Sequence, residues 1–241
     1  MKFSRAQWRC WDCLLTGTYV HKGNEFRFLT LTSADGMTRD LMKCFTLLKY
    51  RIDNLTPLKL VESGYVDGNR LNDFYLNTDL NDKLRFDYLC VKTSEGVKGV
   101  LHIVFVGDFI PTRWLWDNWE NITGVAKSVK IKRVKDLDIV AKYVINQSEL
   151  IGYVAGQSKY VRFSYSKDWV FDGFSKKYDD FMSSFWYREL KNIAKSKGLK
   201  CLPLDAYGFF KSLTKKGRDD FYKKRWSKWL ECVDVIVKND N

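Results

Sequence analysis

The sequence predicts an α+β fold, an antiparallel β-sheet packed with helices, followed by a helical and basic C-terminal extension. Three observations predict it. Residues 25–134 alternate in the order strand, helix, hairpin, helix, strand. The composition, 45% hydrophobic and 16% aromatic, is that of a folded chain with a real core. After Gly173 the pattern changes to helices rich in lysine and aromatic residues.

We therefore divide the 241 residues into three parts. Residues 1–23 form an N-terminal segment with a CxxC pair, residues 24–173 form the main domain, and residues 174–241 form the extension. Cys10 and Cys13 are spaced so that both thiolates can face one tetrahedral ion, with His21 and Cys44 as further ligands. A structural zinc ion is one interpretation of this pair, and two packed free cysteines are the other.

The cysteines also indicate a compartment. All six are scattered without the spacing of a disulfide framework, and no apolar leader precedes them. No apolar run is long enough to span a bilayer. We therefore expect a reduced, cytoplasmic setting and no membrane span.

Alternation of apolar and polar residues predicts the strands. They are 25–33, 84–93, 100–106, 126–134 and one within 159–169 that SKDW (166–169) follows, with 94–99 as the hairpin connection between the second and the third. In the first strand Phe28 and Thr30 share one face, while Leu29 and Leu31 share the other. In 126–134, serine and lysines alternate with apolar residues, which predicts a half-exposed strand.

Helical periodicity and end signals predict the helices. Pro111 suits the first turn of one helix and Gly124 ends it. The predicted helices are 38–51, 111–123, 136–147, 178–197 and 215–237. Glycine and asparagine break residues 58–81, for which we predict no element. The resulting βαββαβ plan, an antiparallel sheet with helices on one face, is RRM-like or palm-like. Such sheets serve RNA binders, primases and replication endonucleases alike, so the plan alone decides no function.

The charge points to a polyanionic partner. The chain has a net charge of +12 and a pI near 9.3, which favours a nucleic acid, with an acidic membrane surface second. The candidate phosphate contacts are Lys127, Lys130, Lys132 and Arg133 in the main domain, and Lys215, Lys216, Lys223, Lys224 and Arg225 in the extension. The alternative is that these side chains only solvate the surface.

A small set of residues could perform phosphoryl-transfer chemistry. His102 interrupts an apolar strand, Glu95 lies at the hairpin, and Tyr143 and Tyr153 follow in a helical region. Imidazole and carboxylate can hold Mg²⁺ or Mn²⁺, which polarises a phosphate, and a tyrosine can attack it. Each residue also has a simpler interpretation: a core histidine, a turn carboxylate and packed helical tyrosines.

Several stretches carry a family resemblance. They are FLTLTS (28–33), SEGVKGVLHIVFVGDFIP (94–111), a Trp-rich helix, SVKIKRV (128–134), AKYVINQ (141–147), YVAGQ (153–157) and FSYSKDWVF (163–171). Over about residues 8–173 the chain resembles archaeal plasmid and virus replication initiators, the rolling-circle Rep proteins with a His-hydrophobic-His signature. These proteins nick DNA through a helical tyrosine and keep a 5′-phosphotyrosine link while a free 3′-OH primes synthesis.

The resemblance implies a role for each matching residue. His102 becomes a metal ligand, Glu95 a further ligand and Tyr143 the nucleophile, with Tyr153 as the second choice. Gln147 stands where the family often has a lysine, and it can orient a phosphate without neutralising it. The His signature is reduced, because valines flank His102 at the spacing of a second ligand on the same strand face.

The sequence therefore predicts a DNA-binding replication initiator that nicks single-stranded or hairpin origin DNA with Mg²⁺ or Mn²⁺. A non-catalytic nucleic-acid-binding protein on the same scaffold is the alternative. A zinc-stabilised transcription regulator, built on Cys10 and Cys13, is a third possibility. The oligomeric state and the origin sequence are not encoded in these patterns.

Overall fold

The structure is a computed structural model. It describes residues 5–33, 40–76, 78–93, 100–124, 126–136, 139–140, 143–144, 163–203 and 205–239. The chain forms two compact units, Met1–Trp169 and Val170–Asn241. The boundary lies four residues before the predicted one, and the N-terminal segment belongs to the first unit.

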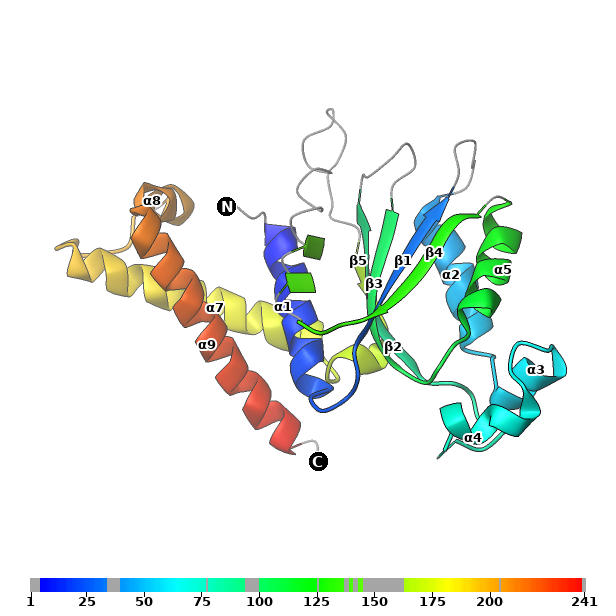
Figure 1. Cartoon of the computed structure of the whole chain (residues 1–241). Coiled ribbons are helices and arrows are strands. Elements are labelled where there is room, and N and C mark those ends of the chain that lie inside the picture. The colour runs from blue at the N-terminus through cyan, green and yellow to red at the C-terminus, as the bar shows by residue number, and fades with distance from the viewer. Residues whose placement is uncertain are drawn as a thin grey trace. The chain divides into compact units, whose positions relative to one another are not determined.

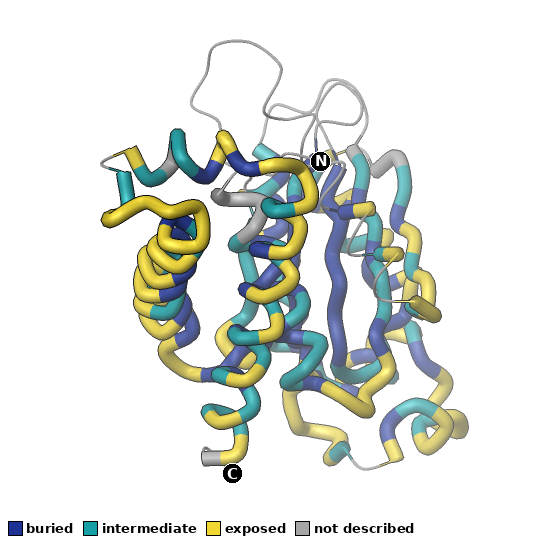
Figure 2. The backbone as a smooth tube through the Cα atoms, turned by 90° about the vertical axis from the view of Figure 1, so that its left-hand side faces the viewer, coloured by how far each residue is buried: buried dark blue, intermediate teal, exposed yellow. Residues whose placement is uncertain are grey.

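The first unit is built on a five-stranded antiparallel sheet of order β4-β1-β3-β2-β5 (Figure 1). Its strands are β1 (Arg27–Ser33), β2 (Phe86–Thr93), β3 (Val100–Gly107), β4 (Ala126–Arg133) and β5 (Phe163–Tyr165). β2 and β3 are buried along almost their whole length (Figure 2). The predicted α+β class with an antiparallel sheet is confirmed.

The helical elements of this unit are α1 (Arg5–Val20), α2 (Leu41–Ile52), α3 (Pro57–Glu62), η1 (Gly68–Arg70), α4 (Leu71–Phe74), α5 (Thr112–Thr123) and η2 (Lys167–Trp169). The ends of α2 and α5 have clear causes. The Asp40 side chain accepts a hydrogen bond from the Met42 amide at the start of α2. Pro111 precedes α5, and Gly124, at φ 82°, ends it in the left-handed conformation that glycine tolerates best.

The main core lies between the sheet and the pair α2 and α5. Alternate residues of β1, β2, β3 and β4 point into it, including Leu29, Leu31, Ile103 and Val129. The helices contribute Phe45, Leu48, Leu115 and Trp119, among others. This alternation is what the sequence predicts for the strands, and it leaves the opposite set of side chains, with Phe28, Thr30 and His102, on the other face.

α1 packs on that other face (Figure 1). It packs against Trp169, which is far away in the sequence. Trp169 is fully buried and donates a hydrogen bond from Nε1 to the Cys13 carbonyl at 3.1 Å. The ring lies against Gly17, where a Cβ atom would come 2.1 Å from the Trp169 Cε2 atom. Helices thus lie on both faces of the sheet, and the prediction of helices on one face only is wrong.

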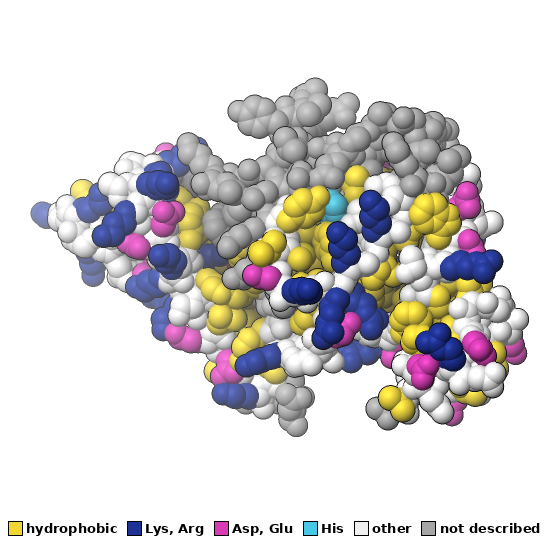
Figure 3. Space-filling view, viewed as in Figure 1, with side chains coloured by type: hydrophobic (Ala, Val, Ile, Leu, Met, Phe, Trp, Pro, Cys, Tyr) yellow, Lys and Arg dark blue, Asp and Glu magenta, His cyan; other side chains and the backbone are white. Residues whose placement is uncertain are grey.

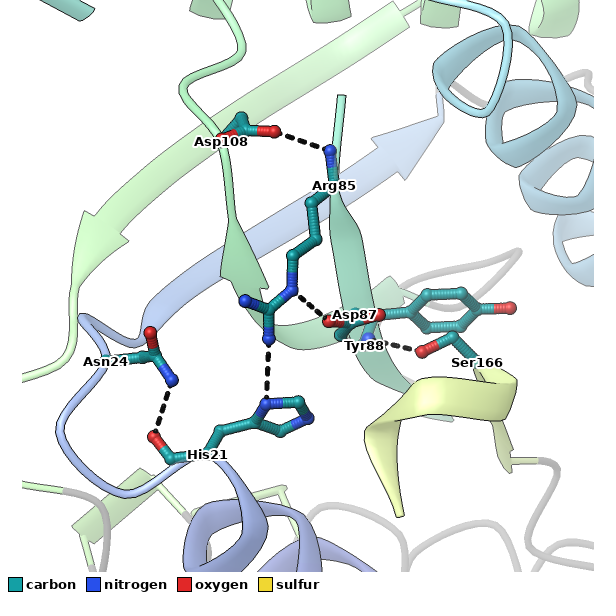
Figure 4. A network of polar contacts seen from close by, with 7 residues as sticks. All are labelled: His21, Asn24, Arg85, Asp87, Tyr88, Asp108 and Ser166. Carbon is teal, nitrogen blue, oxygen red and sulfur yellow. Dashed lines mark hydrogen bonds and ion pairs between the residues drawn. The ribbon is translucent and has the colours of Figure 1, made fainter. Parts of the chain in front are cut away.

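A polar network joins the end of α1 to β2 (Figure 4). Arg85 donates from Nη2 to His21 Nδ1 at 3.1 Å and from Nε to the buried Asp87 carboxylate at 2.6 Å. Its amide donates to Asp108 at 2.6 Å. Burial lowers the pKa of His21. A neutral His21 can accept the Arg85 hydrogen bond, so His21 is a structural contact of the network.

The second unit consists of α7 (Phe174–Ser196), α8 (Ala206–Ser212) and α9 (Lys215–Asn239). Trp229 of α9 packs among the rings of Phe174, Tyr178 and Phe181 from α7, at centroid distances of 5.1–5.9 Å. A second apolar cluster surrounds Phe185 and Phe221. The aromatic residues of the extension therefore serve mainly as the core that holds the helices together.

Residues 58–81, for which we predict no element, contain most of α3 together with η1 and α4. In the predicted stretch 159–169, residues 163–165 pair with β2 and η2 follows, while residues 159–162 lie outside the described residues. The predicted helix 136–147 lies mostly outside the described residues.

Candidate functional site

The candidate site is a row of side chains that crosses the sheet on the face of α1. Register places Thr30 of β1 directly opposite His102 of β3, and Lys130 of β4 opposite Thr30. Val91 of β2 flanks His102 on its other side. Directly opposed residues have Cβ atoms about 5 Å apart. The row thus passes from a cation through a hydroxyl to an imidazole.

His102 lies at the buried part of this row. Its side chain is 2% exposed, and its ring stacks on Phe28 at 5.4 Å between centroids, with 10° between the planes. Burial lowers the pKa of His102 to about 4. The imidazole is therefore neutral near pH 7, which is the form that can bind a metal ion or accept a proton.

Tyr143 lies beside His102. The two ring centroids are 5.2 Å apart and the planes meet at 76°, an edge-on contact. Tyr143 also meets Phe28 edge-on at 6.3 Å, and it stays 40% exposed. The structure therefore brings the predicted metal ligand and the predicted nucleophile together, with the tyrosine on the solvent side of the histidine.

The part of this face nearest the β4 edge is open to solvent. Lys130 and Lys132 are exposed, while Phe28 and Thr30 are half-buried. On the face shown in Figure 3, apolar side chains lie between basic ones. A phosphate bound by the lysines would lie on the same face of the sheet as the His102 and Tyr143 pair.

The other predicted residues of the main domain fall elsewhere. Arg133 lies on the opposite side of β4 from the two lysines, where its Nε is 3.2 Å from Glu25. Glu95, Gln147 and Tyr153 lie outside the described residues, and the Lys127 side chain is also outside them.

The CxxC pair is buried in α1. Cys10 and Cys13 are both 0% exposed, and burial raises the pKa of each thiol. Raised pKa values favour the neutral thiol over the thiolate that zinc requires. The further ligands proposed from the sequence are not beside them, because His21 contacts Arg85 and Cys44 packs in the core on the other face of the sheet.

Within the described residues, no group of three or more His, Cys, Asp and Glu side chains is arranged to hold a metal ion. The described part of the site offers one metal ligand of these types, His102. A divalent ion there would need Glu95, outside the described residues, or oxygen atoms of the DNA.

In the second unit, the predicted phosphate contacts separate into three kinds. Lys215, Lys216 and Lys223 are exposed. Lys224 pairs with the buried carboxylate of Glu189 at 2.5 Å. Arg225 is 2% exposed and donates to the Tyr178 hydroxyl at 3.3 Å. The prediction that Arg225 contacts phosphate at the surface is therefore wrong, because its guanidinium is buried between the helices.

Sequence reasoning missed Phe28 and Thr30 as members of the site. Alternation predicts that they share a face, but only the register of β1 against β3 brings them beside His102. It also missed the exposed basic residues Arg188, Lys191 and Lys195 of α7.

Comparisons with protein-family models, with curated proteins and with solved structures gave no match to this chain. In the described part of the chain, no helix combines the length and the apolar character that crossing a bilayer requires.

The buried histidine predicts a pH-dependent stability. Above pH 6.5, His102 is neutral in both the folded and the unfolded state. Between pH 6.5 and about 4 the unfolded state binds a proton that the folded state does not, so stability falls as the pH falls. We expect a loss on the order of 2–3 kcal/mol across this window.

Denaturant unfolding at a series of pH values measures this loss. The control is His102→Phe, which keeps a ring beside Phe28 and cannot titrate. The difference in unfolding free energy between the two proteins should be constant above pH 6.5 and change below it. An unchanged difference down to pH 4 would contradict the assignment.

Proposed function

We propose that this chain is a DNA-binding replication initiator that nicks one strand of an origin through Tyr143. The observation that carries the proposal is the contact between Tyr143 and His102, at 5.2 Å between ring centroids, on a face that also presents Lys130 and Lys132. The strand order β4-β1-β3-β2, with α2 and α5 on the far face, supports the RRM-like or palm-like plan as part of the proposal.

The reaction follows from the positions of the groups. The tyrosine oxygen attacks the scissile phosphorus, the bond from phosphorus to the 3′ oxygen breaks, and the proton of the phenol ends on the departing 3′-OH. The product is a 5′-phosphotyrosine link, and the energy of the bond is kept for strand transfer. The exposed lysines would bind the flanking phosphates and hold the strand across the face.

The neutral imidazole of His102 has two possible roles in this step. It can take the phenolic proton, or it can bind a divalent ion, Mg²⁺ or Mn²⁺, together with Glu95. Such an ion, when bound, polarises the scissile phosphate. The two roles differ in one measurable property, because only the second makes nicking dependent on a divalent cation.

The test uses the full chain and a pool of single strands of random sequence, because the origin sequence is unknown. Each strand carries a fluorophore at its 3′ end, so that the fragment joined to tyrosine stays labelled. With Mn²⁺ we expect a labelled protein band that survives denaturing electrophoresis, and sequencing of the attached strands reports the origin. Repeating the reaction with chelator decides between the two roles of His102.

A second candidate is a non-catalytic nucleic-acid-binding protein on the same scaffold. The specific observation in its favour is that exposed Lys132 stands directly opposite half-buried Phe28, with exposed Lys130 on the same face of β4. This arrangement suits stacking of a base and binding of its phosphates without any metal. Binding of single strands without a covalent product, over the whole pool, would reject the nickase and favour this candidate.

A further inference from the structure

The C-terminal half of α7 carries a row of exposed cations. Arg188, Lys191 and Lys195 are spaced by three and four residues, so they lie on one face of the helix. Lys197 and Lys200 continue the basic run in the turn that follows. All five side chains are exposed. The opposite face of the same helix is buried and includes Phe185, Leu190 and Ala194.

Few acidic groups offset this row. Glu189 is the acidic residue within 188–200; it is 6% exposed and lies 2.5 Å from Lys224 of α9. Arg188 Nε is 3.7 Å from the other Glu189 oxygen, and its side chain remains 60% exposed. Among the described residues, no carboxylate lies within ion-pair distance of Lys191, Lys195, Lys197 or Lys200.

α9 differs, although its sequence is richer in basic residues. Asp219 and Asp220 are exposed between its lysines, and Arg225 is buried. Lys228 pairs with Glu231 at 2.7 Å, and Lys238 pairs with Asp234 at 2.6 Å. The surface of α9 therefore carries both basic and acidic side chains, whereas the exposed charged side chains of the α7 row are all basic.

Helix stability alone does not explain the α7 row. Cations in the last turn of a helix are favoured by the macrodipole, and this accounts for Lys195. The effect falls off within one turn, so it does not reach Lys191 or Arg188. A row that extends over two turns indicates a partner with a row of negative charges.

We propose that the α7 row, Arg188, Lys191, Lys195, Lys197 and Lys200, binds the phosphate backbone of duplex DNA without reading its sequence. A duplex holds its phosphates at regular spacing and at about one charge per 1.7 Å, which a rigid helix with cations every turn can match. Binding of single strands uses several stacked aromatic rings, and the exposed aromatic residue here is Tyr187 alone among the described residues of this surface.

This surface is distinct from the face of Tyr143, and it shares with the proposed function only the class of partner. The first unit would act on an unpaired strand, and the second would bind a duplex. The duplex surface can therefore be tested whether or not Tyr143 nicks DNA.

The experiment measures binding of the full chain to a labelled duplex of arbitrary sequence by fluorescence anisotropy, from about 50 to 200 mM salt. The variant is Lys191→Glu with Lys195→Glu. We expect at least a tenfold loss of affinity at low salt. We also expect the slope of log K against log salt to fall by about 2, since each lost phosphate contact removes about 0.9.

The matched control is Lys215→Glu with Lys223→Glu, which makes the same change in net charge on exposed positions of α9. It should lose much less affinity than the α7 variant. An equal loss of affinity in both variants would show that only the net charge of the chain matters, and this would overturn the proposal. Wild-type affinity in the α7 variant would overturn it as well. The double substitution Lys191→Gln with Lys195→Gln removes the two charges without reversing them, and it should also lose affinity for the duplex. Circular dichroism of each variant should show the helix content of the wild type, so that the lost affinity is not caused by unfolding.

Two further measurements fix the partner. Single strands of the same length should show a smaller difference between the wild type and the α7 variant than the duplex does. Vesicles containing an anionic lipid should bind more weakly than the duplex at the same salt, and preferential binding to vesicles would overturn the assignment to DNA. Covalent product formation on the single-strand pool, measured on the α7 variant, should be unchanged, so a failure of nicking and a failure of duplex binding are distinguished.

Discussion

Tyr143→Phe should abolish the covalent protein–DNA product and lower nicking by at least about 10³-fold, because the substitution removes only the attacking oxygen. The aromatic ring remains and can keep its edge-on contacts with His102 and Phe28. The residue is 40% exposed, so the unfolding free energy should change by no more than about 0.5 kcal/mol. Affinity for single strands should stay within a few-fold of the wild type.

The control is Tyr50→Phe. Tyr50 is 69% exposed and lies on α2, the helix that packs on the far face of the sheet from His102. This variant should nick like the wild type. A covalent product that persists in Tyr143→Phe would move the nucleophile to another residue, with Tyr153 as the first to examine. Digestion and mass spectrometry of the labelled product identify the attached peptide directly.

The strand faces could be predicted from the sequence because alternation is a local property. Leu29 and Leu31 point into the main core, and Phe28 and Thr30 point away from it, as predicted. The composition of the site could not be predicted in the same way. It depends on which residue of β1 stands opposite His102, and a shift of one position would place an apolar core residue there.

The position of α1 was also beyond local reasoning. Its CxxC spacing suits a metal site, and the same residues suit the buried side of a helix, where Cys10 and Cys13 now lie. Whether the two cysteines bind a metal ion or pack in the core depends on where α1 lies against the sheet, which the local sequence does not determine. Residues 12, 13, 16 and 17 are buried there together with the cysteine at position 10.

Helical periodicity could have predicted that Arg225 is buried. It stands four residues after Phe221 and four before Trp229, on the apolar stripe of α9, and all three side chains are buried. A count of basic residues along the sequence therefore overstates the basic surface of α9. The same count understates α7, whose cations are fewer but share one face.

Gly17→Ala should destabilise the first unit, although alanine is the better helix former by about 1 kcal/mol. The added Cβ would lie 2.1 Å from Cε2 and 2.2 Å from Nε1 of Trp169, far inside the contact distance. Trp169 is 0% exposed and donates from Nε1 to the Cys13 carbonyl, so moving the ring away from the new methyl group would disturb both its packing and this hydrogen bond. Overpacking costs about 1–3 kcal/mol, and contacts as short as 2.1 Å belong to the upper part of that range, about 2–3 kcal/mol. After the helix gain of about 1 kcal/mol we expect a net loss of about 1–2 kcal/mol.

Trp169→Phe tests the cause, because the smaller ring lacks the indole atoms that the new methyl group would meet. Gly17→Ala should cost at least about 1 kcal/mol less in that background than in the wild type, a coupling typical of residues in contact. Gly68→Ala is the matched control, since its Cβ would lie 3.5 Å from the nearest atom, in ordinary contact with Val61. Equal costs in both backgrounds would show that position 17 requires glycine for a reason other than contact with Trp169.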